Sequence, residues 1–386
     1  MLEVPVKSPE SRWLLTCLRE HFADKPRKKL LRAEMEGLIA SDFDWHAMFE
    51  LAGYHVVRPL VYQYFYRKAF DGVPQQAHHE LSTFIRHNLV STTLLASNLP
   101  KVLSILQKHG VAALPYKGPV LASILYGDAA LREFSDLDIL IRQVDIEPAC
   151  HALTEAGFTT APSLNPRVRH AFLLHSTACE FTAPSAVFRM ELHWKNSGRS
   201  VHSFPEEWFW QNKQKVMLGD LDVETVPLMT HLLLLCIHGG KHGWSRMGYL
   251  CDIATLVQKY PDMDWGTFWD RARTCGAERM CALAFHLVEQ ILGAPIPVAM
   301  ELTSHTHDLS GLVLASMHLM KNENEPGAFY ALQLQDSFRG KIRFLARMGF
   351  TPGIKEYSMF NLPPKLHFLY SGIRAARMAG MLVRNL

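Results

Sequence analysis

The segment from Phe134 to Ile141 constrains the fold most, because it places two acids inside a run with the composition of a buried strand. Side chains alternate faces along a strand, so Asp136 and Asp138 point the same way, about 7 Å apart. The intervening apolar side chains then point into a core: Leu137, Ile139 and Ile141. Two carboxylates on one face repel each other and are costly to bury unless a cation holds them together. The segment therefore predicts a divalent metal site, and oxygen ligands favour Mg²⁺ or Mn²⁺.

Length and composition describe an ordinary globular protein. The chain has 386 residues, of which 48% are hydrophobic and 20% charged, enough for two or three domains. The first residues contain acids and a proline and no apolar stretch, so we expect no signal peptide. The longest purely apolar run, near residues 232–237, is too short to span a bilayer, so we expect no transmembrane segment. Seven scattered cysteines without a C-x-x-C pair favour a cytoplasmic location and argue against disulfides or zinc.

Positive charge is concentrated at the C-terminal end. From Arg339 onward there are nine Lys or Arg residues and one acid, Glu356, a net charge of 9 − 1 = +8. The chain as a whole carries +3, so the remainder carries 3 − 8 = −5. A continuous helix would place Arg374, Arg377 and Arg384 near one face. We therefore predict contact between this region and an anionic ligand or membrane surface, with a solvated helical face as the alternative.

Hydrophobic periodicity divides the chain into three parts. Helices are predicted over 9–23, over 28–40, and after Pro74 as far as His109-Gly110. A mixed pattern follows, with strands at 111–116, 136–141 and 187–194 and helices at 119–126 and 145–156. From residue 230 the pattern is helical again. We predict an N-terminal helical region at 1–95, an α+β core at 96–229 and a C-terminal helical domain at 230–386.

Several polar residues around the Asp136 strand can serve phosphate chemistry. Lys117 and Gly118 lie where a strand meets a helix N-terminus, whose free N–H groups attract phosphate, although most such junctions are only turns. Arg132 lies in the loop before Asp136, where an arginine alone is usually a solvated charge. Glu191 lies on the polar face of the strand at 187–194, together with Arg189 and His193. Glu191 is either an exposed strand residue or a third carboxylate, and three carboxylates from two strands can hold two metals about 3.5–4 Å apart.

In this order, the motifs resemble an uncharacterised family of bacterial nucleotidyltransferases in the DNA polymerase beta-like superfamily. The resemblance rests on Leu114–Ala122, Leu125–Asp128, Arg132 and Ser135–Ile141, and Glu191-Leu192-His193-Trp194 is similar to the segment with the family's third carboxylate. It implies an α+β fold, with a small mixed β-sheet nucleotidyltransferase core and helices, flanked by N-terminal and C-terminal helical regions. One departure is the turn Gly118-Pro119, where the superfamily usually has Gly-Ser or Gly-Gly, so no serine hydroxyl is offered to the phosphate there.

The resemblance also implies an activity and a set of site residues. The expected reaction is metal-dependent transfer of a nucleoside monophosphate from a nucleoside triphosphate to a small-molecule, saccharide or peptide acceptor, with release of pyrophosphate. The residues expected to bind the metal and act in catalysis are Asp136, Asp138 and Glu191. The residues expected to bind the nucleotide are Lys117, Gly118, Arg132, Ser135, Lys241 and His242. Asp252 is expected either in the same cleft or as a partner of Arg246.

Two other functions stay open at this point. An Asp-x-Asp motif also occurs in metal-dependent glycosyltransferases that use a nucleotide-sugar, and the same fold can serve as a catalytically idle binding or antitoxin-like module. A zinc site at His238 and His242 is not expected, because the glutamate of the zinc-protease motif is replaced by Gly239. Changing Asp136 or Asp138 to asparagine is expected to abolish turnover and to relieve repulsion in the metal-free protein.

Overall fold

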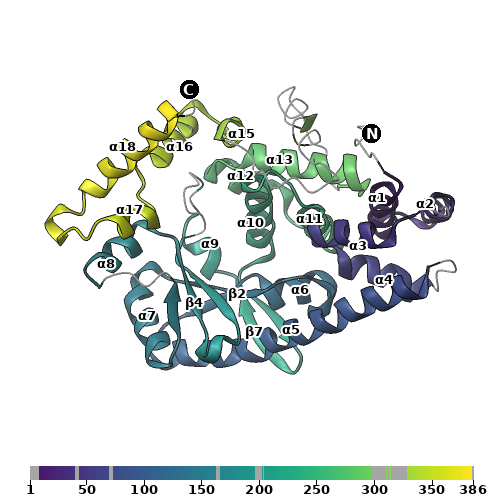
Figure 1. The fold of residues 1–386 in the computed structure, drawn as a ribbon, viewed down its shortest axis with the longest axis horizontal. Helices are drawn as coiled ribbons and strands as arrows, with labels where there is room; N and C mark the ends of the chain where they lie inside the picture. Colours follow the sequence, from purple (N-terminus) through teal and green to yellow (C-terminus); the bar gives the residue numbers. More distant parts are fainter. Residues whose placement is uncertain are drawn as a thin grey trace.

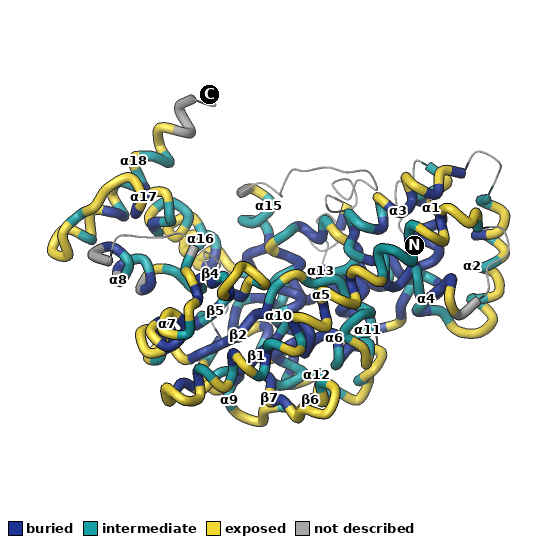
Figure 2. Tube along the Cα trace, turned by 60° about the horizontal axis from the view of Figure 1, so that its bottom comes forward, coloured by how far each residue is buried: buried dark blue, intermediate teal, exposed yellow. Residues whose placement is uncertain are grey.

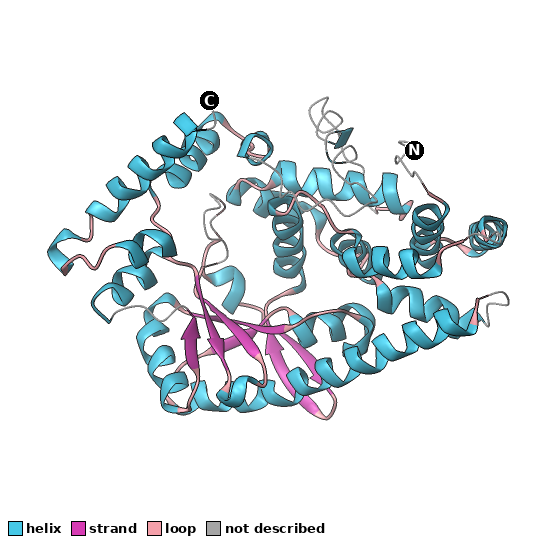
Figure 3. Ribbon diagram, viewed as in Figure 1, coloured by secondary structure: helices cyan, strands magenta, loops and turns pink. Residues whose placement is uncertain are grey.

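The structure is a computed structural model that describes residues 8–39, 43–68, 73–161, 166–195, 202, 204–296, 310–311, 313 and 328–384. Over these residues the protein is an α+β fold, in which a small sheet is surrounded by helices (Figure 3). The strands are β1 (Ala113–Pro115), β2 (Asp136–Ile141), β3 (Thr159–Ala161), β4 (Ala178–Thr182), β5 (Arg189–His193), β6 (Gln214–Leu218) and β7 (Leu221–Thr225). The helices before and within the sheet are α1 (Pro9–Phe22), α2 (Lys25–Leu38), α3 (Trp45–Tyr54), α4 (Arg58–Lys68), α5 (Gln75–Lys108), α6 (Gly118–Tyr126), α7 (Ile146–Glu155), α8 (Pro166–His175) and α9 (Glu207–Trp210).

The helices after the sheet form the upper part of the molecule in Figure 1. They are α10 (Leu228–Lys241), α11 (Met247–Lys259), α12 (Trp265–Cys275), α13 (Glu278–Leu287), α15 (Ala328–Gln333), α16 (Phe338–Phe350), α17 (Ile354–Met359) and α18 (Leu369–Arg384). Short helical turns lie at Ala129–Leu131, Gln143–Asp145, Pro184–Ala186, Val288–Leu292 and Pro364–Leu366.

The main sheet has the strand order β1-β2-β5-β4-β3. Strands β2 and β5 run parallel, while the other neighbouring pairs run antiparallel. In the β2–β5 register, Asp136 is opposite Arg189, Asp138 is opposite Glu191 and Leu140 is opposite His193. The sheet is therefore mixed, and it brings the two acidic strands side by side. Strands β6 and β7 form a separate hairpin.

The two faces of the sheet have different roles. Leu137, Ile139 and Ile141 are at most 1% exposed and pack in one core with apolar residues of α5 and α7, which confirms the predicted buried face of this strand. Helix α5 runs beneath the sheet in Figure 1. The acids of β2 and β5 lie on the opposite face, which is turned toward α10 and α11. The alternation in β2 thus separates a packed face from a polar one.

Helix α5 is long and apolar enough to cross a membrane by length and composition, and 28% of its most apolar window is buried. Its apolar stripe at Leu95, Leu99, Val102 and Leu106 belongs to the core beneath the sheet. The side-chain amide of Asn88 donates to the carbonyl oxygen of Ala130 at 2.8 Å. These contacts place one side of α5 against the core beneath the sheet. The predicted boundary near residue 96 falls within α5, and the division into domains stays a prediction.

The N-terminal and C-terminal helices share one hydrophobic core. Residues of α1, α3 and α4 pack with residues of α10, α11, α12 and α13. Leu114, Tyr116, Leu121, Leu125 and Leu140 contribute to the same core from the sheet side. The helices that precede the sheet in the sequence and those that follow it therefore pack together over the polar face of the sheet.

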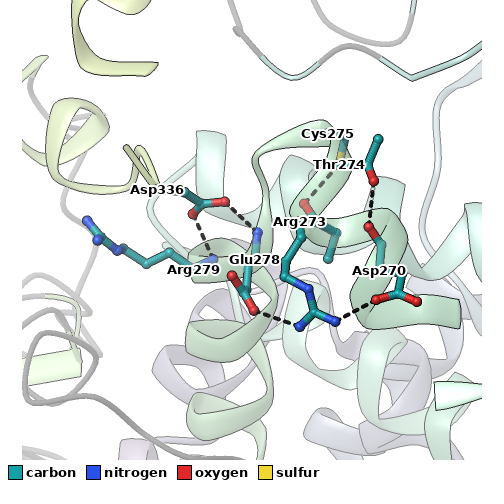
Figure 4. Close-up of polar contacts among 8 residues, drawn as sticks. Asp270, Arg273, Thr274, Cys275, Glu278, Arg279 and Asp336 are labelled. Carbon is teal, nitrogen blue, oxygen red and sulfur yellow. Dashed lines mark hydrogen bonds and ion pairs between the residues drawn. The ribbon is translucent and has the colours of Figure 1, made fainter. Parts of the chain in front are cut away.

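Residues 328–384, here named the C-terminal arm, are attached to the rest of the protein at two places. At one end, the Asp336 carboxylate accepts from the backbone N–H groups of Glu278 and Arg279, both at 2.9 Å, and so caps α13 (Figure 4). At the other end, Tyr357 and Tyr370 pack against Val168 and Ala171 of α8.

The predicted exposed face of Arg374, Arg377 and Arg384 is wrong for the first two residues. Glu356 is fully buried, and its Oε1 lies 2.5 Å from Arg377 Nε and 3.5 Å from Arg374 Nη1. Arg374 is only 4% exposed. Glu356, the acid of this basic region, thus lies inside the arm and pairs with both Arg374 and Arg377. The side chain of Arg384 lies outside the described part of the structure.

Candidate active site

The acids of β2 and β5 converge because the two strands are parallel neighbours. Asp138 and Glu191 are register partners, and adjacent strands lie about 4.8 Å apart. The nearest ligand atoms of Asp138, Glu191 and His193 all lie within 4.8 Å of one another. Asp136 is half-buried at the start of β2 and lines the same cleft as Asp138 and Glu191. The structure thus brings together the three carboxylates expected from the sequence and adds an imidazole.

Asp138 is the most strongly held of these acids. Its Oδ1 accepts from Lys117 Nζ at 2.9 Å and lies 3.0 Å from His193 Nε2, and its side chain is 8% exposed. Burial opposes the charged carboxylate, but Lys117 and His193 together lower the pKa of Asp138 far below its usual range. Burial likewise opposes a charged His193, but its hydrogen bonds to Asp138 and Glu191 raise the pKa of the imidazole.

Asp136 has the opposite environment. Burial and the neighbouring charges of Asp138 and Glu191 raise the pKa of its carboxyl group. The pKa of Glu191 is lowered, chiefly by its hydrogen bond to His193, whose Nε2 lies 3.1 Å from Glu191 Oε2. One acid of the site is therefore short of positive charge in the metal-free protein, while the other two are compensated.

The corner between β1 and α6 places Lys117 beside Asp138. The backbone N–H of Tyr116 donates to the Asp138 carbonyl oxygen at 3.2 Å, which continues the β1–β2 ladder to the edge of the turn. Gly118 follows with a φ of +51°, and a Cβ there would lie 3.1 Å from the Asp136 carbonyl oxygen. Glycine is required for both reasons. Burial opposes a charged lysine, but Tyr116 and Asp138 raise the pKa of Lys117, so its ammonium stays charged.

The loop that carries Arg132 is fixed by long-range contacts. Arg132 Nε donates to Asp252 Oδ2 at 3.0 Å, and the Tyr126 hydroxyl donates to Asp252 Oδ1 at 2.9 Å. Burial and the charge of Asp252 raise the pKa of Tyr126 well above its usual range, so this hydroxyl stays a donor. In the same loop, Glu133 accepts from Arg58 Nη2 at 2.7 Å. Asp252 therefore pairs with Arg132 and lines the same cleft as the carboxylates, which is the first of its two expected places, and its ion pair is with Arg132 and not with Arg246.

Two cavities meet at the carboxylates. The first has a volume of about 300 Å³ and is lined by the residues of β2, by the Lys117 corner and by helices α10 and α11. Its polar lining includes Lys117, Gly118, Arg132, Ser135, Asp136, Asp138, Glu191, Arg246 and Asp252. The second has a volume of about 490 Å³ and includes Lys195, Lys241 and His242. Lys117, Glu191 and His238 line both cavities. Lys241 and His242 thus lie in the second cavity, apart from Gly118, Arg132 and Ser135, while Lys117 reaches both cavities.

The site contains residues that the sequence prediction left out. His193 had a local signal, because strand alternation put it on the polar face of Glu191. Tyr126 lies in the Leu125–Asp128 segment of the resemblance but was given no role there. His238 and Tyr249 had no local signal, because they come from helices α10 and α11 and reach the site only through the fold. Burial and the charge of Lys117 hold the pKa of His238 well below its usual range, so this imidazole is neutral.

The fold and this arrangement of acids, lysine and arginine define a nucleotidyltransferase. The chain belongs to a family described as uncharacterised nucleotidyltransferases, whose sequence profile matches residues 41–293. That range contains every site residue expected from the sequence, and it confirms the resemblance and the enzyme class.

Two further comparisons add little. The chain is similar to a solution structure of the antibiotic-resistance factor ANT(2'')-Ia, with 9% sequence identity and a TM-score of 0.36. The match covers 50% of this chain and 97% of that chain. At this level of similarity it says nothing about the substrate. No curated protein sequence matches the chain significantly.

Proposed function

We propose that this nucleotidyltransferase transfers a nucleoside monophosphate from a nucleoside triphosphate to an acceptor in a metal-dependent reaction that releases pyrophosphate. The observation that carries the proposal is the register of Asp138 with Glu191 beside Lys117, at the point where two cavities meet. Membership in the family favours this reaction over the glycosyltransferase and over the idle binding module.

The donor set suits a hard divalent cation. Carboxylate oxygens are the ligands that Mg²⁺ and Mn²⁺ prefer. Asp136, Asp138 and Glu191 would hold the metal, with His193 orienting the two partner carboxylates through its contacts with both. When bound, the metal neutralises charge on the phosphates and on the acids.

The first cavity is the proposed nucleotide site. The ammonium of Lys117 and the free N–H groups at the start of α6 face phosphate, with Pro119 contributing no donor. Arg132 uses its Nε for Asp252, and a guanidinium has five N–H donors, so others can bind phosphate oxygens. Phe134 and Tyr249 add aromatic surface to this cavity.

The second cavity is the proposed acceptor site. Glu191 lies on the wall that it shares with the first cavity and is placed to take a proton from an attacking hydroxyl. An acceptor oxygen attacks the α-phosphorus in line, the bond to the bridging oxygen breaks, and pyrophosphate leaves. Among the described lining residues Glu191 is the sole acid, whereas Lys117, Lys195 and Lys241 are cations. This balance favours an acceptor with a negatively charged group, whether a small molecule, a saccharide or a peptide.

The test is release of pyrophosphate from each common nucleoside triphosphate, with Mg²⁺ or Mn²⁺, against phosphorylated and neutral acceptors. We expect release that depends on metal and is lost in Glu191→Gln. Lys241→Ala should raise the KM of a phosphorylated acceptor and leave the KM of the nucleotide unchanged. Release of a nucleoside diphosphate from a nucleotide-sugar would instead indicate the glycosyltransferase. Nucleotide binding without any pyrophosphate release, across the acceptor panel, would indicate the idle module.

A further inference from the structure

Helix α16 exposes an apolar stripe. Phe338, Ile342 and Leu345 are 76%, 51% and 47% exposed. Their spacing of four and three residues places them on one face of the helix. Gly340 is the sole buried residue of α16, so this helix lies on the protein with little of its surface covered. Figure 2 shows the same for much of the C-terminal arm.

The rest of the arm exposes further large apolar residues. They lie at the ends of α16, α17 and α18 and in the segments between these helices: Phe350, Met359, Phe360, Leu366, Phe368 and Leu369. Apolar side chains exposed singly are normal on a protein surface, but a concentration like this one usually marks an interaction site.

The charge of the same segment has one sign. Residues 338–369 contain six Lys or Arg residues and a single acid, Glu356. Glu356 is buried and paired with Arg374 and Arg377, so it adds no negative charge to the surface. On the α16 wheel, Arg339 flanks the apolar stripe on one side and Lys341 on the other, whereas Arg343 lies on the far side of the helix. Such flanking cations can extend their charged ends toward phosphate while their alkyl chains stay beside apolar groups.

We infer that the C-terminal arm binds an anionic lipid membrane. The stripe on α16 would enter the boundary between headgroups and acyl chains, and the flanking cations would contact lipid phosphates. A second copy of the chain is disfavoured on this face, because it would bring a segment of the same positive charge against it. A bilayer supplies apolar and anionic surface together and needs no groove, which suits apolar residues spread over a helix and several turns.

Membrane binding would also place the second cavity. Phe344 of α16, the helix that carries the stripe, is one of the residues that line that cavity. A protein docked through α16 would hold this cavity at the membrane surface. The assignment of this cavity as the acceptor site rests on the proposed function. The inference of lipid binding does not.

The test is sedimentation of the full chain with vesicles of phosphatidylcholine, with and without phosphatidylglycerol, at increasing salt. We expect binding to the anionic vesicles that weakens as salt rises. Arg339→Gln/Lys341→Gln should weaken it about 30-fold, because each cation near an anionic surface contributes about 1 kcal/mol. Phe338→Ser/Ile342→Ser/Leu345→Ser should abolish it. The matched controls are Lys101→Gln and Val144→Ser, which change an exposed cation and an exposed apolar residue elsewhere and should bind as wild type does.

Each variant is checked for native circular dichroism and for pyrophosphate release in solution, which the arm substitutions should leave unchanged. Equal binding of wild type to neutral and anionic vesicles would overturn the inference. So would wild-type binding in both arm variants, or a vesicle-free dimer that the apolar triple variant breaks, because the face would then serve a second copy. Loss of pyrophosphate release in all proteins, with vesicle binding intact, would count against the proposed function and leave the membrane inference standing.

Discussion

Replacing Asp138 with asparagine is expected to destabilise the metal-free protein, whereas the same change at Asp136 is not. Lys117 and His193 contact Asp138 Oδ1 at 2.9 and 3.0 Å, and the Asp138 side chain is 8% exposed. The amide removes the counter-charge of Lys117 and leaves His193 with Glu191 alone. Asp136 lacks such a partner, and removing its charge relieves repulsion by Asp138 and Glu191. For Asp138, these contacts lead us to expect the opposite of the relief of repulsion that the sequence alone predicted for either change.

The size of the difference follows from burial. Removing one partner of a buried ion pair costs roughly 3–5 kcal/mol, and asparagine keeps an oxygen that can accept from Lys117, so we expect about 3 kcal/mol for Asp138→Asn. For Asp136→Asn we expect equal or higher stability. The lowered pKa of Asp138 means that its contribution is present at neutral pH and is lost as the pH falls through its folded-state pKa. The raised pKa of Asp136 means that its penalty disappears as the pH falls.

The assay is urea unfolding of both variants and wild type in the presence of a chelator, at neutral pH and again in acid. A loss of about 3 kcal/mol lowers the midpoint by about 1 M for an m-value near 3 kcal/mol/M. Both variants should lack pyrophosphate release with metal present. The reasoning fails if Asp138→Asn is as stable as wild type at neutral pH, or if Asp136→Asn is the less stable of the two.

Three further changes test other parts of the structure. Gly118→Ala should lower kcat/KM for the nucleotide about tenfold, because a left-handed backbone costs other residues roughly 1–2 kcal/mol; an unchanged value would show that the corner is not strained. Asp252→Asn should raise the nucleotide KM through a mobile Arg132, with a smaller effect on urea unfolding than Asp138→Asn has. Glu356→Ala should speed proteolysis within residues 338–384, because the charged carboxylate holds Arg374 and Arg377. Burial opposes the charged form of Glu356, but hydrogen bonds and both arginines lower its pKa. In wild type the protection against proteolysis should therefore be present above pH 4.5 and be lost as the pH falls below it. Proteolysis that is equally fast in both proteins would refute the role of Glu356.

The sequence predicted the parts of the site that have a local pattern. Strand alternation put Asp136 and Asp138 on one face of their strand, and Glu191 with His193 on one face of theirs. The parallel pairing of β2 with β5 then brought these residues together on one face of the sheet. The helix boundaries of α5, α6 and α7 were close to those observed, since glycine and proline mark them. Strand β4 and the β6–β7 hairpin were not predicted, because their alternation is short and mixed with polar residues.

Contacts between distant segments had no sequence signal. The pairing of Arg132 with Asp252 joins residues 120 positions apart. Arg374 and Arg377 are turned inward by their ion pairs with one acid, Glu356. The burial of Glu356 does not follow from the hydrophobic periodicity of the sequence. Charge counts therefore predicted a basic region correctly but assigned its exposed charges to the wrong residues.

The hydrogen bonds of Asp252 with Arg132 and Tyr126 limit which part of this enzyme can be transferred to another protein. All three candidate metal ligands and Lys117 lie between residues 117 and 191, so this stretch looks like a portable catalytic cassette. Part of the proposed nucleotide cavity, however, comes from α10 and α11, and Leu121 and Leu125 of α6 pack in the core of those helices. A graft of the sheet alone would carry the acids without Asp252, which holds Arg132 in place. The smallest unit that can be moved to another protein is therefore the sheet together with its helical roof.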